Sequence, residues 1–336
     1  MHLSDLDKFD SKGMFRTYDK WPEIAKESFQ KKNMNFSIEN IDHIIFAGMG
    51  GSGNIGDVIA SIFSKENIHV NVTKGYVLPK TVDSNTLIVV TSVSGDTQES
   101  LSILKQANEL EAKVIAFSSG GKMEKYCIEN KILFQKIIME HSPRASLPKF
   151  LFSMLNILKN IIPITEKDVL ESISSLEKTR NEIYSGNLKA DNTAYNIAKW
   201  ITNTPVIYYP RGLNSVAIRF KNSLYENSKI HVISEEVLEV CHNGIVAWES
   251  DKTFQPILIR GKDDHEKTKE RWNIIKDFFI KENINFLELN SIEGNILTKI
   301  INLIYITDYA SIYHAILHGN DPSPVSPIEF IKNKLL

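Results

Sequence analysis

The chain is poor in cysteine, in net charge and in long uninterrupted apolar runs, and each shortage excludes a class of protein. Two cysteines, Cys127 and Cys241, do not suggest a disulfide framework or a zinc site, and they fit a reducing cytoplasm. A formal net charge of −2 provides no global field that favours nucleic acid or an anionic membrane. These shortages indicate an ordinary soluble protein.

The most apolar stretches are broken by charged residues. Lys149 and Lys159 interrupt the stretch 147–162, and Lys299 and Asp308 interrupt the stretch 296–317. Neither reaches the roughly 18 uninterrupted apolar residues that a membrane span needs. The N-terminal segment is polar and acidic, which does not suggest a signal peptide. We therefore expect a cytoplasmic protein that binds neither membrane nor nucleic acid.

A length of 336 residues is enough for two domains of about 150 residues each. Strand and helix patterns alternate in both halves, which is typical of parallel sheets covered on both sides. The predicted strands are His43–Ala47, His69–Thr73, Leu87–Ser92, Lys113–Ser118, Ile132–Lys136, Val206–Tyr209, Ile230–Ser234, Phe254–Arg260 and Phe286–Asn290. Long helices are predicted at about Leu213–Ser228 and Ile296–His318. We predict an N-terminal α/β domain (1–155), a helical linker (156–190) and a second α/β domain with a C-terminal helix (191–336).

The most informative motif is a glycine-rich turn after the first strand. The strand ending at Ala47 leads into Gly48-Met49-Gly50-Gly51-Ser52-Gly53, and helical spacing follows. Glycines let the backbone approach an anion closely, and a helix N-terminus directs unpaired N–H groups toward it. The motif therefore predicts an anion-binding turn.

A second loop, 91–97, follows the third predicted strand and is rich in hydroxyls. Ser92, Ser94 and Thr97 stand in front of another helix, where they could surround a phosphate. Two such loops on one sheet favour a phosphate held by hydroxyls and amides, without a metal or a large basic cluster. We expect no cofactor, and no His, Cys, Asp or Glu cluster has metal-ligand spacing.

Three other interpretations of the glycine turn compete with anion binding. A dinucleotide site expects a carboxylate about 20 residues further on, but the second strand ends at Thr73-Lys74-Gly75. A P-loop expects Gly-Lys-Ser/Thr, which is absent. A tight turn of purely structural value stays open, although it does not explain the hydroxyls of the second loop.

Taken together, the two loops resemble the sugar isomerase (SIS) domain. Further segments are similar to the bifunctional phosphoglucose/phosphomannose isomerase family, in the same order along nearly the whole chain. They are the stretches 143–148 (PRASLP), 219–229 (RFKNSLYENSK), 241–248 (CHNGIVAW), 308–313 (DYASIY) and 321–325 (DPSPV).

This resemblance implies two tandem SIS domains, each a doubly wound, flavodoxin-like parallel sheet flanked by helices. It also implies an isomerase that converts glucose 6-phosphate, mannose 6-phosphate or both to fructose 6-phosphate through a cis-enediol. The catalytic residues would be Arg144, Glu226 and His242, with the histidine reaching the site of the neighbouring subunit in a homodimer. The phosphate-binding residues would be Gly50, Gly51, Ser52, Ser92, Ser94 and Thr97.

The residue types suit those roles. Imidazole titrates near neutral pH and can shuttle the proton of ring opening, a shielded carboxylate is an effective base, and guanidinium is a permanent cation for the enediolate. One departure is that the family's C-terminal lysine aligns with Leu317. Either His314, His318 or Lys332 takes the place of that lysine, or ring opening relies on His242 alone. A second departure is Tyr209-Pro210-Arg211-Gly212 in place of the family's usual Tyr-Gly-Ser-Gly.

The sequence is also compatible with two alternative functions. A non-catalytic sugar-phosphate sensor would use the same loops and would explain the missing lysine. An NAD-dependent oxidoreductase would need the acidic residue that is absent after the second strand. How far glucose and mannose epimers are distinguished depends on individual hydrogen bonds to the C2 hydroxyl.

Overall fold

The structure is a computed structural model that describes residues 2–32, 36–110, 112–250 and 252–335. The chain divides into two compact units. Unit 1 comprises residues 1–19, 175–293 and 299–336, and unit 2 comprises residues 20–174 and 294–298. The N-terminal helices α1 (Leu3–Phe9) and α2 (Met14–Asp19) therefore belong to the same unit as the C-terminal half of the chain.

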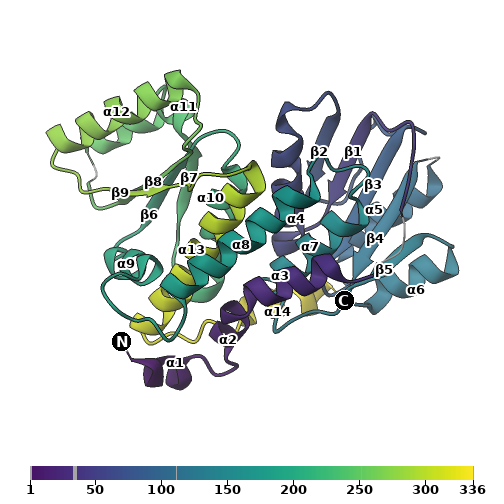
Figure 1. Cartoon of the computed structure of the whole chain (residues 1–336), viewed down its shortest axis with the longest axis horizontal. Coiled ribbons are helices and arrows are strands. Elements are labelled where there is room, and N and C mark those ends of the chain that lie inside the picture. Colours follow the sequence, from purple (N-terminus) through teal and green to yellow (C-terminus); the bar gives the residue numbers. More distant parts are fainter. Residues whose placement is uncertain (1, 33–35, 111, 251, 336) are drawn as a thin grey trace. The chain divides into compact units, whose positions relative to one another are not determined.

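Unit 2 contains a five-stranded parallel sheet in the order β2-β1-β3-β4-β5 (Figure 1). The strands are β1 (His43–Ala47), β2 (His69–Thr73), β3 (Thr86–Ser92), β4 (Lys113–Ser118) and β5 (Leu133–Lys136). All residues of β1 and β3 are buried, because these strands are covered on both faces, whereas the edge strands are partly exposed. This strand order is that of flavodoxin-like, doubly wound folds.

Helices cover both faces of this sheet. Ile45, Ile88 and Ala116 point to one face and pack on α5 (Gln98–Glu109) and α6 (Gly121–Glu129). On the other face, Phe46 meets Gly56 of α4 (Gly50–Ile62), and Thr91 meets Met154 of α7 (Leu147–Ile157). Helix α3 (Trp21–Gln30) packs on α7 in the same unit, and the one-turn helix η1 (Phe63–Lys65) follows α4.

Unit 1 contains a four-stranded parallel sheet in the equivalent order β7-β6-β8-β9 (Figure 1). Its strands are β6 (Pro205–Tyr209), β7 (Ile233–Glu236), β8 (Gln255–Arg260) and β9 (Leu287–Asn290). One face packs on α11 (Val237–Val240), η3 (Gly244–Glu249) and α12 (Glu266–Lys281), and Trp248, Trp272 and Phe279 fill that layer. Helix α10 (Asn214–Ser223) follows β6 and continues into a π-helical turn, η2 (Leu224–Ser228).

The core helix of unit 1 is α13 (Ile296–Leu317), whose first residues belong to unit 2. Its tyrosines hold the surrounding helices through their hydroxyls. Tyr305 donates to the Tyr18 carbonyl at 2.7 Å, and Tyr313 donates to the carbonyl of Ile183, at the end of α8 (Glu166–Ile183), at 2.6 Å. Helices α9 (Thr193–Trp200) and α14 (Ser326–Leu335) complete the unit.

Helix α13 has the length and the mean hydropathy (1.3) of a membrane span, but 89% of its apolar window is buried within the protein. The two charged residues that interrupt its apolar run both form ion pairs inside unit 1. Lys299 binds Asp263, and Asp308 binds Arg219. These pairings are those of a core helix in a globular protein.

The predicted α/β class with two parallel sheets is confirmed, and so are most strands to within a residue. The strand predicted at Ile230–Ser234 is misplaced, since β7 spans Ile233–Glu236. Lys229 adopts a left-handed conformation (φ +61°) that closes the π-turn, and the Val232 carbonyl accepts a hydrogen bond from the Tyr225 hydroxyl. Residues 230–232 therefore connect the π-turn to the strand without pairing in the sheet.

Candidate active site

The two predicted phosphate loops meet at one place in unit 2. Strands β1 and β3 are parallel neighbours, so the glycine turn after β1 and the loop 93–97 after β3 lie at the same edge of the sheet. The chain leaves β1 toward β2 on one side and leaves β3 toward β4 on the other. In such sheets, ligands bind outside the carboxyl ends of the strands where the winding direction changes.

Glycine is required in both loops for conformational and steric reasons. Gly50 has φ +52°, a left-handed conformation at the first residue of α4. Gly95 has φ +80°, and a Cβ atom there would lie 1.9 Å from the Gly120 carbonyl oxygen. Side chains at these positions would deform the turns, so the glycines set the shape of both loops.

Hydroxyls connect the two loops and shape the second one. The Ser52 Oγ accepts a hydrogen bond from the Val93 N–H at 3.1 Å, which ties the start of α4 to the second loop. The Ser92 Oγ accepts from the Gly95 N–H at 3.1 Å and donates to Thr97 Oγ1 at 3.0 Å. Ser92 is 1% exposed. Its hydroxyl therefore organises the loop.

Accessible groups lie around this organised core. Gly50 is exposed, while Gly51, Ser94 and Thr97 are half-buried. The cap residues of α4 and α5, Met49 and Thr97, make no side-chain hydrogen bond to the helix ends that they precede. Helix N-termini whose N–H groups are not capped by side chains attract anions through those groups and through the helix dipole. The geometry suits a phosphate group.

Lys74, a residue with no predicted role, lies beside the glycine turn. It follows β2, which neighbours β1, and its Cε would lie 3.0 Å from a Cβ at Gly53. Its ammonium group pairs with Asp57 of α4 at 2.6 Å. Burial raises the pKa of Asp57, and the nearby Lys74 opposes that rise. A signal was available, because a lysine stands where a dinucleotide site would have its carboxylate.

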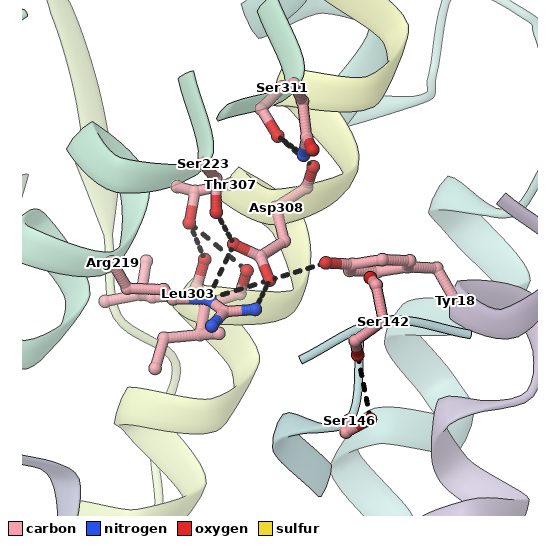
Figure 2. A network of polar contacts seen from close by, with 11 residues as sticks. Tyr18, Ser142, Ser146, Arg219, Ser223, Leu303, Thr307, Asp308 and Ser311 are labelled. Atoms are coloured by element: carbon pink, nitrogen blue, oxygen red, sulfur yellow. Dashed lines mark hydrogen bonds and ion pairs between the residues drawn. The ribbon is translucent and has the colours of Figure 1, made fainter. Parts of the chain in front are cut away.

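Arg144 lies in unit 2, in the turn that precedes α7, and is 5% exposed. The turn is held by Ser146, whose Oγ donates to the Ser142 carbonyl at 2.8 Å (Figure 2). The same Oγ accepts a hydrogen bond from the Glu140 N–H at 3.0 Å. Glu140 also pairs with Lys149 in the first turn of α7. The serine side chain thus defines the path of the backbone that carries Arg144.

Glu226 and His242 belong to unit 1. Glu226 is half-buried in the π-helical turn at the end of α10. His242 is exposed in the loop after α11, where neighbouring Asn243 donates to Glu239 Oε1 at 3.0 Å. The phosphate-loop residues and Arg144 therefore lie in one unit, and the predicted base and the predicted ring-opening histidine lie in the other.

The residues considered as substitutes for the family's lysine differ in their surroundings. Leu317 is half-buried in the last turn of α13, and Lys332 is exposed on α14. His314 is 3% exposed, and its ring stacks on that of His318 at 4.1 Å between centroids. Burial, followed by the neighbouring His318, lowers the pKa of His314 to about 4. His314 is therefore neutral at pH 7.

A cavity of about 220 Å³ in unit 2 lies apart from the predicted site. Residues of α3, α7 and the end of β5 line it: Glu27, Ser28, Lys31, Gln135, Lys136, Ile137, Ile138, Lys149 and Ser153. Two of its lysines pair with carboxylates, Lys136 with Glu124 and Lys149 with Glu140. The lining contains none of the residues predicted to bind or convert a substrate.

Comparison with known proteins identifies the family. Residues 37–154 match the SIS domain model, and residues 190–335 match the model of the bacterial phospho-glucose isomerase C-terminal SIS domain. A bifunctional phosphoglucose/phosphomannose isomerase of Caldicellulosiruptor bescii is 32% identical, with 96% of this chain and 98% of the relative covered. The chain belongs to the bifunctional phosphoglucose/phosphomannose isomerase family.

A second relative of the same name, from Aquifex aeolicus, is 29% identical and covers 96% of both chains. Among solved structures, the C-terminal domain of glucosamine-fructose-6-phosphate aminotransferase from Francisella tularensis superimposes with a TM-score of 0.68 at 20% identity. It covers 92% of this chain and 96% of that domain. The similarity to this solved structure confirms the fold. The similarity to the family's curated members shows that the protein is a sugar-phosphate isomerase.

Proposed function

We propose that the protein interconverts glucose 6-phosphate, mannose 6-phosphate or both with fructose 6-phosphate, by a metal-free proton transfer through a cis-enediol. One observation carries the proposal. The N-termini of α4 and α5 lie at the carboxyl ends of β1 and β3, and neither is capped by the side chain that precedes it. The hydrogen bond from the Val93 N–H to Ser52 ties their two loops together, in a chain that belongs to this family. A hexose 6-phosphate supplies the anion that such loops bind.

The proposal assigns phosphate binding to both loops. Hydroxyls and backbone amides would hold the phosphate oxygens, and the ammonium group of Lys74, which is paired with Asp57, lies nearby. The binding residues would be Gly50, Gly51, Ser52, Ser94 and Thr97, and Ser92, whose hydroxyl bonds to Gly95 and Thr97, would shape the loop that holds them. Anchoring of the phosphate would hold the reacting carbons in a fixed position, which lowers the entropic cost of the later proton transfers.

The reaction is an internal oxidation and reduction. The Glu226 carboxylate would remove the proton from C2 of the aldose and return it to C1, while a hydroxyl proton moves between O2 and O1. Carbon 2 is then oxidised to the ketone as carbon 1 is reduced to the alcohol, with no external redox partner. Arg144 would stabilise the negative charge of the enediolate, since guanidinium is always protonated.

Ring opening is assigned to His242, from the partner subunit of a homodimer. The exposure of His242 in this chain supports the assignment, because an exposed histidine is available to a second subunit. The low pKa and burial of His314 argue against its replacing a cationic lysine. The proposal assigns the proton exchange between the ring oxygen and O1 to His242.

Purified protein tests the proposal with fructose 6-phosphate, by measuring the formation of glucose 6-phosphate and mannose 6-phosphate. Glu226→Gln keeps the shape of the side chain and removes the base, so kcat should fall by about 10²–10⁴-fold. Glu270→Gln, which alters an exposed glutamate on α12, is the matched control and should retain activity. Wild-type protein without turnover would refute the proposal.

A non-catalytic sugar-phosphate sensor is the second candidate, and Leu317 at the position of the family's lysine favours it. The sensor would bind fructose 6-phosphate without converting it. Calorimetric titration of the wild-type protein, carried out beside the activity assay, distinguishes the two functions. Binding without product supports the sensor, and binding with product supports the isomerase.

A further inference from the structure

Glu226 stands in an unusual piece of backbone. Helix α10 does not end as an α-helix, because residues 224–228 form a π-helical turn that ends when the Lys229 N–H donates to the Leu224 carbonyl. Lys229 is left-handed at φ +61°. Such turns are rare and are often found at functional sites. The position and direction of the Glu226 side chain depend on whatever holds this turn.

Three side chains of α10 and the π-turn bind α13. The Ser223 Oγ donates to Asp308 Oδ1 at 2.6 Å, the Asn227 Nδ2 donates to the Ser311 Oγ at 2.8 Å, and the Ser228 Oγ donates to the Ser311 carbonyl at 2.8 Å. Ser223, on one side of Glu226, and Asn227 and Ser228, on the other, are all nearly fully buried. We call this set of bonds to Asp308 and Ser311 the α13 clamp.

Asp308 is itself held in a fixed orientation. Arg219 of α10 donates through Nε and Nη2 to both carboxylate oxygens at 2.7–3.1 Å, and the Tyr18 hydroxyl donates at 3.2 Å (Figure 2). The fork of a guanidinium group gives such a pair a defined geometry. The Asp308 carboxylate, which accepts the hydrogen bond from the Ser223 hydroxyl, therefore cannot rotate freely.

Bonds from the segment that follows α13 close the other end of the turn. Lys229 Nζ donates to the Pro324 carbonyl at 2.7 Å and also contacts the Glu226 carbonyl, and Asn320 Nδ2 donates to the Ser228 carbonyl at 3.4 Å. The backbone on both sides of Glu226 is thus bonded to α13 and to the segment after it. The Glu226 side chain remains half-buried and accessible.

Stability alone is a weak explanation for so many buried polar groups. Replacing a buried ion pair with well-packed apolar side chains is often neutral or stabilising. A catalytic carboxylate, by contrast, must be held within a fraction of an ångström of its productive position. A polar clamp defines such a position more sharply than apolar packing, because its bonds are directional.

We propose that Asp308 and Ser311 are positioning residues, which hold the π-turn so that Glu226 meets the reacting carbons of the substrate. The proposal rests on the proposed function, since it presumes that Glu226 is the base. The proposal can be tested independently at each end of the clamp, through the Ser223–Asp308 contact before Glu226 and the Asn227–Ser311 contact after it.

Ser311→Ala removes the acceptor of Asn227 and leaves the Ser311 carbonyl in place. We expect kcat for fructose 6-phosphate to fall by about 10–10²-fold while KM changes less than about twofold, because misplacement of a reacting group acts on the chemical step. Ser311→Thr, which restores the hydroxyl, should recover much of the loss. Ser223→Ala tests the other end of the clamp, should Ser311→Ala fail to fold.

Thr307→Val is the matched control. Thr307 is also a fully buried hydroxyl of α13, one residue before Asp308, but its Oγ1 bonds to the Leu303 and Ile304 carbonyls of its own helix (Figure 2). Its replacement should leave kcat within about twofold of wild type. A general effect of removing a buried hydroxyl would instead lower kcat equally in Thr307→Val and Ser311→Ala, and that result would overturn the positioning role.

The outcomes separate this proposal from the proposed function. If wild-type protein is active, Glu226→Gln is inactive and folded Ser311→Ala and Ser223→Ala both keep wild-type kcat, the positioning role is wrong and the isomerase stands. If wild-type protein is itself inactive, the proposed function fails and the positioning role fails with it. A parallel fall in kcat for Ser311→Ala and Ser223→Ala, with KM unchanged, supports the clamp.

Discussion

Replacement of Asp308 by asparagine should destabilise unit 1 severely while changing the shape of the side chain very little. Asp308 is 0% exposed and receives hydrogen bonds from Arg219, Ser223 and Tyr18. Burial lowers the pKa of Arg219, but the charge and hydrogen bonds of Asp308, together with Tyr18 and Glu226, more than offset this effect, so the Arg219 pKa lies above its ordinary value. A guanidinium group is so basic that Arg219 stays charged even when Asp308 is replaced.

The size of the effect follows from what the substitution leaves behind. In Asp308→Asn the guanidinium of Arg219 stays buried without its counter-charge, and the new amide presents N–H donors toward one of the former donors. Breaking a buried pair by removing one partner costs about 3–5 kcal/mol. A loss of this size is a large fraction of the usual free energy of unfolding, about 5–15 kcal/mol.

Urea unfolding followed by far-UV circular dichroism measures the loss, as a shift in the midpoint of the transition that involves unit 1. The double variant Arg219→Met/Asp308→Leu is the control, because it removes both charges together and fills the space with apolar atoms. We expect it to unfold closer to wild type than Asp308→Asn does. The reasoning is refuted if Asp308→Asn costs less than about 1 kcal/mol, or if the double variant is as unstable as the single one.

Two further predictions concern burial at other sites. The pKa of His314 is about 4 in the folded protein and 6.5 in a model peptide, so stability is complete above pH 6.5 and falls as the pH drops toward 4. At pH 5 the protonation of His314 in the unfolded chain should cost about 2 kcal/mol of stability. Urea unfolding at pH 7.5 and at pH 5 should therefore show a smaller change in the free energy of unfolding for His314→Gln than for the wild type. An equal change in both proteins would contradict the low pKa of His314. Ser52→Ala should raise KM for fructose 6-phosphate and cost about 1–3 kcal/mol of stability, since the Val93 N–H loses its acceptor. An unchanged KM in steady-state kinetics would exclude Ser52 from phosphate binding.

The sheets were predictable because their signals are local. Apolar runs such as 43–47 and 87–90 are bounded by glycines and hydroxyl residues, and parallel strands that alternate with helices can assemble in only a few ways. The same locality made the positions of the glycine turn and the second loop predictable, since each follows a strand and precedes a helix. Their hydrogen bond, from the Val93 N–H to Ser52, then follows from the adjacency of β1 and β3.

The π-turn was not predictable, because the residues that create it lie far away in the chain. The period of apolar residues continues through Leu224, so the sequence pattern favours one uninterrupted helix over 213–228. The wider turn is held by Asp308 and Ser311, more than 80 residues later. Tyr18, which bonds to Asp308 across 290 residues, could not be assigned to this unit from local sequence either.

The most direct test of the account is to run the reaction in D₂O and to analyse the sugar phosphates by NMR and mass spectrometry. On the proposed mechanism a proton carried by Glu226 would exchange with solvent. After many turnovers of fructose 6-phosphate the aldose 6-phosphate should then carry deuterium at C2, and the Glu226→Gln variant should incorporate it far more slowly. Interconversion that retains only protium at C2 would contradict transfer through an enediol and a carboxylate base.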